Sequence, residues 1–71
     1  MTPEQKDKYQ RLDDRLAELD NINRKIGRLR FYLNENTDDI DSDAMSVMIA
    51  QCGAMAIYRD KLEDRIVKGW Y

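Results

Sequence analysis

The segment from Ala44 to Tyr58 reads AMSVMIAQCGAMAIY and contains no charged residue, although 37% of the chain is charged. One helical stripe has apolar residues at spacings of three and four, namely Met45, Met48, Cys52 and Met55. Other apolar residues fall on other sides of the same helix, namely Val47, Ile49, Ala54 and Ile57. A helix that is apolar on all sides is expected to be buried on all sides, and a chain of 71 residues has too little mass to do this alone. We therefore expect this segment to lie at the centre of an oligomer or against a partner.

Length and composition predict a single helical-hairpin domain over residues 1–71 that needs more than its own core. The core of so short a chain contributes only about 3–5 kcal/mol, and small domains add disulfides, a metal or oligomerisation. One cysteine and no histidine exclude an intrachain disulfide and a Cys/His metal site. We expect no cofactor and no metal, and we expect a homo-oligomer.

The same features predict a cytoplasmic protein. The uncharged run in 44–58 is shorter than the roughly 18 apolar residues that indicate a membrane span. A single cysteine without a signal peptide suits a reducing compartment. The net charge of −2 gives no general attraction to nucleic acid, which is therefore not an expected partner.

The fold class predicted is all-α, with a first helix over about residues 3–33. Thr2, Pro3 and Gln5 form a capping-box sequence with proline at the first helical position. Apolar residues then recur at steps of three and four, as Tyr9, Leu12, Leu16, Leu19, Ile22, Ile26, Leu29 and Leu33. This periodicity is typical of one long amphipathic helix.

Residues 34–41, NENTDDID, form the predicted loop, because they are rich in Asn and Asp and nearly free of apolar residues. A second helix is expected over about residues 42–68, with Asp39 or Asp41 as its cap and Gly69 as a left-handed stop. The two helices make an antiparallel hairpin. The predicted register pairs Leu29 with Met45.

A ridge of small residues on the second helix predicts where hairpins meet. Ser46, Ala50 and Ala54 are four residues apart, and Gly53 lies beside them. Small side chains let helix backbones approach closely, so we expect the second helices of different protomers to cross here in a tetramer or hexamer. The predicted interface consists of Ser46, Ile49, Ala50, Gly53, Ala54 and Ile57.

Nothing in the sequence predicts an enzyme. The absence of histidine excludes nucleophile–base pairs that use it, and no glycine-rich phosphate loop is present. Cys52 lies on the apolar stripe and is expected to be a buried core residue. The acidic residues of 38–43 lack the ligand spacing of a calcium loop and are expected to be solvated.

A basic segment ends the first helix. Residues 21–33 contain Arg24, Lys25, Arg28 and Arg30 and no acid. Cations beside apolar and aromatic surface suit a ligand with phosphates and flat rings, and Tyr32 and Tyr58 are the nearest aromatics. We expect this segment to border the contact between protomers. The alternative is that the cations only balance the acidic loop and favour the carboxyl end of the helix dipole.

The residues Leu29–Leu33 (LRFYL), the polar loop and the pattern of Met, Gln, Tyr, Leu and Arg-Ile in 45–66 resemble a family of small helical-hairpin proteins of bacteriophages, including phages of gut bacteria. More distantly, the layout is similar to phage anti-CBASS and anti-Thoeris sponges. Those proteins are helical-hairpin oligomers that sequester the nucleotide signals of host immunity. The resemblance implies a role in ligand binding for Tyr9, Arg24, Lys25 and Arg28.

Two functions follow. The first is a counter-defence protein of the infected bacterial cell that binds a cyclic oligonucleotide or cyclic ADP-ribose type signal without turning it over. Its predicted ligand-binding residues are Arg24, Lys25, Arg28, Tyr9, Tyr32 and Tyr58. The second is a protein-binding hairpin that inhibits a host protein or serves as a small assembly factor. It would use the apolar face of 44–58 against a foreign partner.

Overall fold

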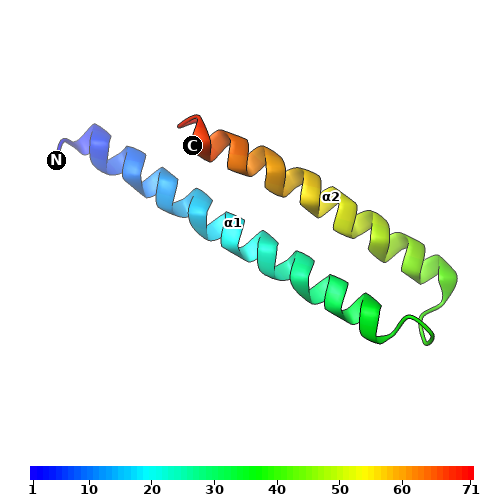
Figure 1. Cartoon of the computed structure of the whole chain (residues 1–71). Helices are drawn as coiled ribbons and strands as arrows, with labels where there is room; N and C mark the ends of the chain where they lie inside the picture. The colour runs from blue at the N-terminus through cyan, green and yellow to red at the C-terminus, as the bar shows by residue number, and fades with distance from the viewer.

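Two long helices lie side by side and run in opposite directions (Figure 1). The computed structural model describes all residues from Met1 to Tyr71. Helix α1 spans Pro3–Glu35 and helix α2 spans Ser42–Val67. The hairpin is a rod with extents of 56 × 16 × 14 Å. The predicted all-α hairpin is therefore confirmed.

The start of α1 has the capping box that its sequence predicts. The Gln5 backbone N–H donates to the Thr2 hydroxyl at 3.2 Å, and the Thr2 N–H donates to the Gln5 side-chain oxygen at 3.0 Å. These two bonds satisfy donors that a helix start leaves without intrahelical partners. The chain thus enters α1 in a fixed conformation.

The other end of α1 lies two residues beyond its predicted limit, at Glu35. Asn36 caps it, because both its backbone N–H and its side-chain amide donate to the Tyr32 carbonyl oxygen, at 3.1 and 2.8 Å. The Thr37 hydroxyl donates to the Leu33 carbonyl oxygen at 2.8 Å. Local side-chain hydrogen bonds therefore hold the last carbonyls of the helix.

Helix α2 begins after Asp41, one of the two predicted caps, although the Asp41 side chain makes no capping hydrogen bond. It ends at Val67, one residue before the predicted limit. Gly69 has a φ of 74° and is the left-handed stop that the sequence predicts. The Trp70 N–H then donates to the Arg65 carbonyl oxygen at 2.7 Å, which closes the helix end.

The register of the hairpin differs from the predicted one by about one helical turn. Met45 lines the same hollow as Leu33, whereas the predicted register paired it with Leu29. At the other end of the rod, the Lys8 ammonium lies 6.0 Å from the centre of the Tyr71 ring. The two added residues of α1 account for part of this shift, because they move the fold point of the chain toward the second helix.

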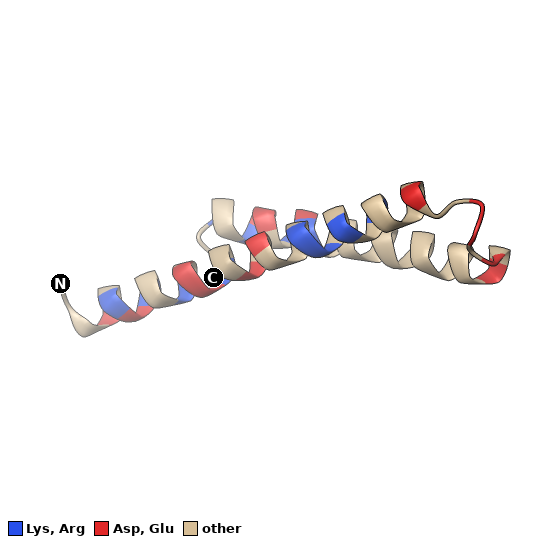
Figure 2. Ribbon diagram, turned by 90° about the horizontal axis from the view of Figure 1, so that it is seen from below, with Lys and Arg blue, Asp and Glu red and all other residues tan.

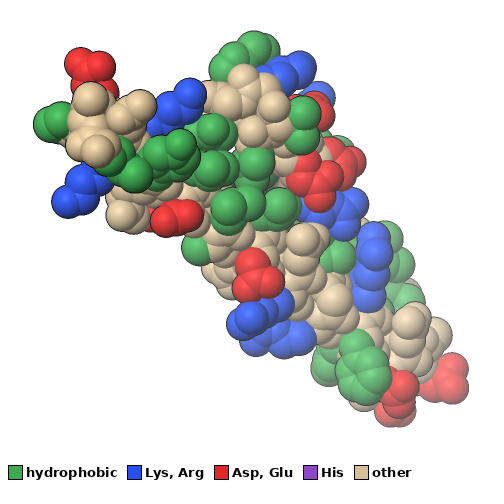
Figure 3. Space-filling model, turned by 60° about the vertical axis from the view of Figure 1, so that its left-hand side comes forward, with side chains coloured by type: hydrophobic (Ala, Val, Ile, Leu, Met, Phe, Trp, Pro, Cys, Tyr) green, Lys and Arg blue, Asp and Glu red, His purple; other side chains and the backbone are tan.

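The core of a single hairpin is small. Only Ile26, Cys52 and Leu62 are buried, with relative exposures of 2, 9 and 2%. The prediction that Cys52 is buried is confirmed. The first turns of α1 extend past the end of α2 (Figure 1), and residues 3–11 are all exposed. Hydrophobic side chains are interleaved with charged ones on the molecular surface (Figure 3).

Neither helix combines the length and the apolar character that a membrane crossing requires.

The two C-terminal aromatics do not pack alike. Tyr71 is partly covered, whereas Trp70 is largely exposed. The Trp70 ring instead lies beneath the Lys68 ammonium, at 4.9 Å from the ring centre.

Candidate functional site

Arg24 and Arg28 of the basic segment face away from α2. Arg24 and Arg28 are each two residues from the buried Ile26, which places them about 200° around the helix from it. Both side chains are exposed, as is that of Lys25. Figure 2 shows these cations as a blue band in the second half of α1, toward the loop. We call these three residues the basic outer face.

The cations of this segment differ in their partners. The Arg24 guanidinium pairs with the Asp20 carboxylate at 3.0 Å. Lys25, Arg28 and Arg30 make no ion pair and no side-chain hydrogen bond within the hairpin. Since no acid of the same chain neutralises these three charges, they are free to bind an anion.

The predicted aromatic ligand residues do not converge in one hairpin. Tyr32 follows Arg28 by one turn on α1 and is exposed. Tyr9 precedes Arg24 by fifteen residues on the same helix, which is about 22 Å. Tyr58 lies on α2 and is exposed. One small ligand on a single hairpin can therefore contact Tyr32 together with Arg28, but not Tyr9 as well.

Sequence reasoning left out Phe31, which lies three residues after Arg28 and is one of the most exposed large hydrophobic side chains of α1. Residues three apart on a helix are neighbours on its surface. Phe31 therefore adds an aromatic ring to the basic outer face. Its three-residue spacing from Arg28, off the apolar stripe, was the signal that could have identified it.

The predicted protomer contact lies on the opposite side of the hairpin. Ala50 and Ala54 are each two residues from the buried Cys52, so they face away from α1. All six predicted contact residues are exposed in the single chain. We call these six residues, Ser46, Ile49, Ala50, Gly53, Ala54 and Ile57, the small-residue face.

This geometry corrects one expectation about the site. The basic segment as a whole was expected to border the contact between protomers. Within one hairpin, however, its Arg24 and Arg28 lie on the opposite outer side from Ala50 and Ala54. The reason is helical periodicity, because Arg24 and Arg28 turn away from Ile26 just as Ala50 and Ala54 turn away from Cys52. Within one chain the two faces cannot form a common site.

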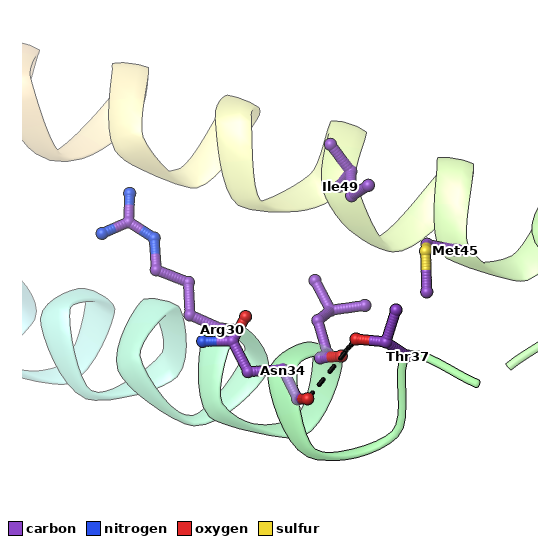
Figure 4. Close-up of a pocket in the computed structure, with 6 residues that line it drawn as sticks. Arg30, Asn34, Thr37, Met45 and Ile49 are labelled. Carbon is purple, nitrogen blue, oxygen red and sulfur yellow. Dashed lines mark hydrogen bonds between the residues drawn. The ribbon is translucent and has the colours of Figure 1, made fainter. Parts of the chain in front are cut away.

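A hollow of about 310 Å³ lies between the helices near the loop (Figure 4). Its lining residues are Arg30, Leu33, Asn34, Thr37, Met45 and Ile49. Leu33, Met45 and Ile49 supply apolar surface, and the Arg30 side chain extends from α1 toward α2. Sequence reasoning counted Arg30 in the basic segment but did not predict this hollow, because it depends on the register of the two helices.

The family model described as Sequestin matches residues 4–68 of the chain. The chain belongs to the Sequestin family. Comparison with curated proteins and with solved structures gives no match.

The Sequestin match covers nearly the whole of both helices and the loop between them. The basic outer face, the small-residue face and the hollow all lie inside it, whereas Trp70 and Tyr71 lie beyond it. Membership of the Sequestin family fits the expectation of a small helical sequestering protein. No three His, Cys, Asp or Glu side chains converge on a position that could hold a metal ion.

Proposed function

We propose that this member of the Sequestin family sequesters a nucleotide signal of bacterial immunity in the phage-infected cell and does so without catalysis. The signal is a cyclic oligonucleotide or a molecule of the cyclic ADP-ribose type. The family name suggests sequestration of a ligand. The observation that carries the proposal is the basic outer face, where Lys25 and Arg28 have no acidic partner and an exposed Tyr32 lies one turn away.

Each part of such a ligand has a matching group on this face. A guanidinium binds phosphate through two parallel charge-assisted hydrogen bonds, and Arg28 is free to do so. A base can stack on the ring of Tyr32, since stacking on an aromatic side chain stabilises a base by about 1–3 kcal/mol. These contacts bind and hold the ligand. They offer no nucleophile or general base that would cleave it.

Oligomerisation belongs to the same proposal. The three buried residues of one hairpin form a very small core, and contact across the small-residue face adds buried apolar area. A tetramer or hexamer built in this way has several copies of each ligand surface. Sequestration benefits from this arrangement, because each assembly removes several signal molecules from solution.

The function is tested by mixing the purified protein with a panel of cyclic dinucleotides, cyclic trinucleotides and cyclic ADP-ribose isomers. Native mass spectrometry then reports the oligomer and any bound ligand together. Heating the complex and analysing the released small molecule distinguishes binding from turnover, because a sequestered ligand is recovered intact. We expect Arg28→Ala to abolish binding and Lys61→Ala, which removes one exposed charge from α2, to leave it unchanged. A panel that yields no complex contradicts the proposal.

A second function is favoured by the exposed apolar side chains of α2. Val47 and Ile57 are 68 and 64% exposed in the single hairpin, and exposed apolar patches mark protein-interaction surfaces. A protein-binding hairpin, either an inhibitor of a host protein or an assembly factor, would cover them with a foreign partner. Light scattering separates the two functions. A discrete tetramer or hexamer means that the face is used by self-association, and a monomer favours the foreign partner.

A further inference from the structure

The hollow near the loop combines an unpaired cation with apolar walls. Arg30 makes no ion pair and no side-chain hydrogen bond within the chain. Its side chain extends from α1 toward α2 beside the hollow (Figure 4). Leu33, Met45 and Ile49 form the apolar part of the lining. An anion held by Arg30 would therefore lie next to apolar surface on both helices.

The rest of the lining is polar and fixed. The Thr37 hydroxyl donates to the Leu33 carbonyl oxygen at 2.8 Å, so the first loop residues are held against the end of α1. The Asn34 side-chain amide also lines the hollow and makes no hydrogen bond within the chain. The hollow thus offers a guanidinium and a free amide, both of which can donate to phosphate or sugar oxygens.

The position of the hollow relates it to the proposed protomer contact. Ile49 lines the hollow and also belongs to the small-residue face. A second hairpin packed on that face would reach the rim of the hollow and would shield Arg30 from water. Electrostatic interactions are stronger where water is excluded. The same hairpin would not shield the basic outer face from water, because that face lies on the opposite side.

We propose that this hollow is a second phosphate subsite for the sequestered nucleotide, in addition to the one that Arg28 offers on the basic outer face. Arg30 binds a phosphate group, and Leu33, Met45 and Ile49 pack against the adjoining sugar or base. The volume of about 310 Å³ is at the lower end of the range for ligand pockets, about 300–1,000 Å³, so it suits one nucleotide unit. This inference rests on the proposed function and names Arg30, which the sequence-based set of ligand residues omitted.

Calorimetry with the nucleotide that binds the wild-type protein gives the first test. We expect Arg30→Ala to weaken binding about 10- to 100-fold, the effect of losing a hydrogen bond to a charged group. Lysine keeps the charge but loses the planar fork, so Arg30→Lys is expected to recover only part of the affinity. Lys61→Ala is the matched control for the loss of one positive charge. Equal affinities for Arg30→Ala and Lys61→Ala would overturn the subsite and leave the proposed function intact.

Titration with inorganic pyrophosphate, followed by NMR, tests the anion site without any nucleotide. We expect chemical-shift changes at the Arg30 side-chain N–H and at the Met45 and Ile49 methyl groups, with Arg30→Ala removing the methyl changes. If the nucleotide panel fails while these shifts occur, the proposed function is wrong and the anion site stands. If shifts appear only at Lys25 and Arg28, the subsite is wrong. Circular dichroism verifies that Arg30→Ala remains helical, as expected for an exposed residue.

Discussion

The Arg24 guanidinium lies 3.0 Å from the Asp20 carboxylate, one turn earlier on the outer face of α1. Both side chains are largely exposed, and such surface pairs contribute about 0–1 kcal/mol. The pair matters for the proposed function, because Asp20 would compete with a phosphate for Arg24. Arg28, one turn later, has no such competitor. The two arginines lie one turn apart on the same face of α1. Only Arg28 can bind an anion without first breaking an ion pair.

We expect Asp20→Asn to raise nucleotide affinity about two- to fivefold, since it frees Arg24 at the cost of one weak surface pair. The affinity is measured by calorimetry at low and at physiological salt. Asp64→Asn is the control, because it makes the same charge change on α2. An equal gain from both variants would show that net charge, and not the release of Arg24, causes the effect.

The two mid-helix glycines provide a test of close approach between protomers. Neither Gly27 nor Gly53 has an atom within 4 Å of an added Cβ inside the hairpin. Glycine costs about 1 kcal/mol relative to alanine in a helix, so Gly27→Ala and Gly53→Ala should each stabilise the isolated hairpin by about that amount.

If Gly53 lies in a protomer contact, Gly53→Ala raises helix content at low protein concentration but shifts the oligomer toward monomer. Analytical ultracentrifugation and circular dichroism measure the two effects separately. Gly69→Ala is the comparison, since the φ of 74° is strained for alanine and the substitution should destabilise by about 1 kcal/mol. If Gly53→Ala forms the same oligomer as the wild type, the protomer contact lies elsewhere.

A charge on the small-residue face is expected to break the oligomer. Ile57→Arg puts a guanidinium at the predicted contact, where it would be buried without a partner. Val67→Arg makes a similar change at another exposed position of the same helix, outside the predicted contact. Light scattering should give a smaller particle for Ile57→Arg and the wild-type size for Val67→Arg. Identical sizes for all three proteins contradict the proposed face.

The core is so small that truncating one buried side chain should unfold the hairpin. Leu62 is 2% exposed, and Leu→Ala at a buried site costs about 2–5 kcal/mol. This is close to the whole stability that a core of such a domain supplies, about 3–5 kcal/mol. We expect Leu62→Ala to be largely unfolded by circular dichroism at 25 °C.

Val47→Ala removes apolar volume from an exposed position of the same helix and should leave the single hairpin as stable as wild type. If Leu62→Ala has the same midpoint temperature of thermal unfolding as the wild type, contacts between protomers supply most of the stability. In that case Val47→Ala becomes informative at high protein concentration, where a loss of stability would place Val47 in the interface.

Much of the fold could be predicted because its signals are local. The capping box of Thr2, the polar loop and the left-handed Gly69 each act within a few residues, and each is present in the structure. The predicted end of α1 was two residues too early, because the side chains of Asn36 and Thr37 cap the helix further along the chain. That small error accounts for part of the shift in register.

The candidate site was predictable only in its parts. A run of cations in 21–33 is visible in the sequence, but the structure is what shows that Arg28 has no ion-pair partner while Arg24 has one. The site geometry depends on which side of each helix turns inward, and Ile26 and Cys52 settle this. Their burial separates the basic outer face from the small-residue face, although the sequence placed both near the middle of the chain.

The sequence by itself determined the two helices, the loop that joins them and the excess of apolar surface on residues 44–58. These follow from capping, periodicity and composition, which act over short distances along the chain. Only the tertiary structure decided that Arg30 reaches the hollow beside Met45 and Ile49 while Arg24 and Arg28 point away. The physical reason is that the packing of one helix on the other fixes the register and the rotation of both, and neither quantity is set within a single helix.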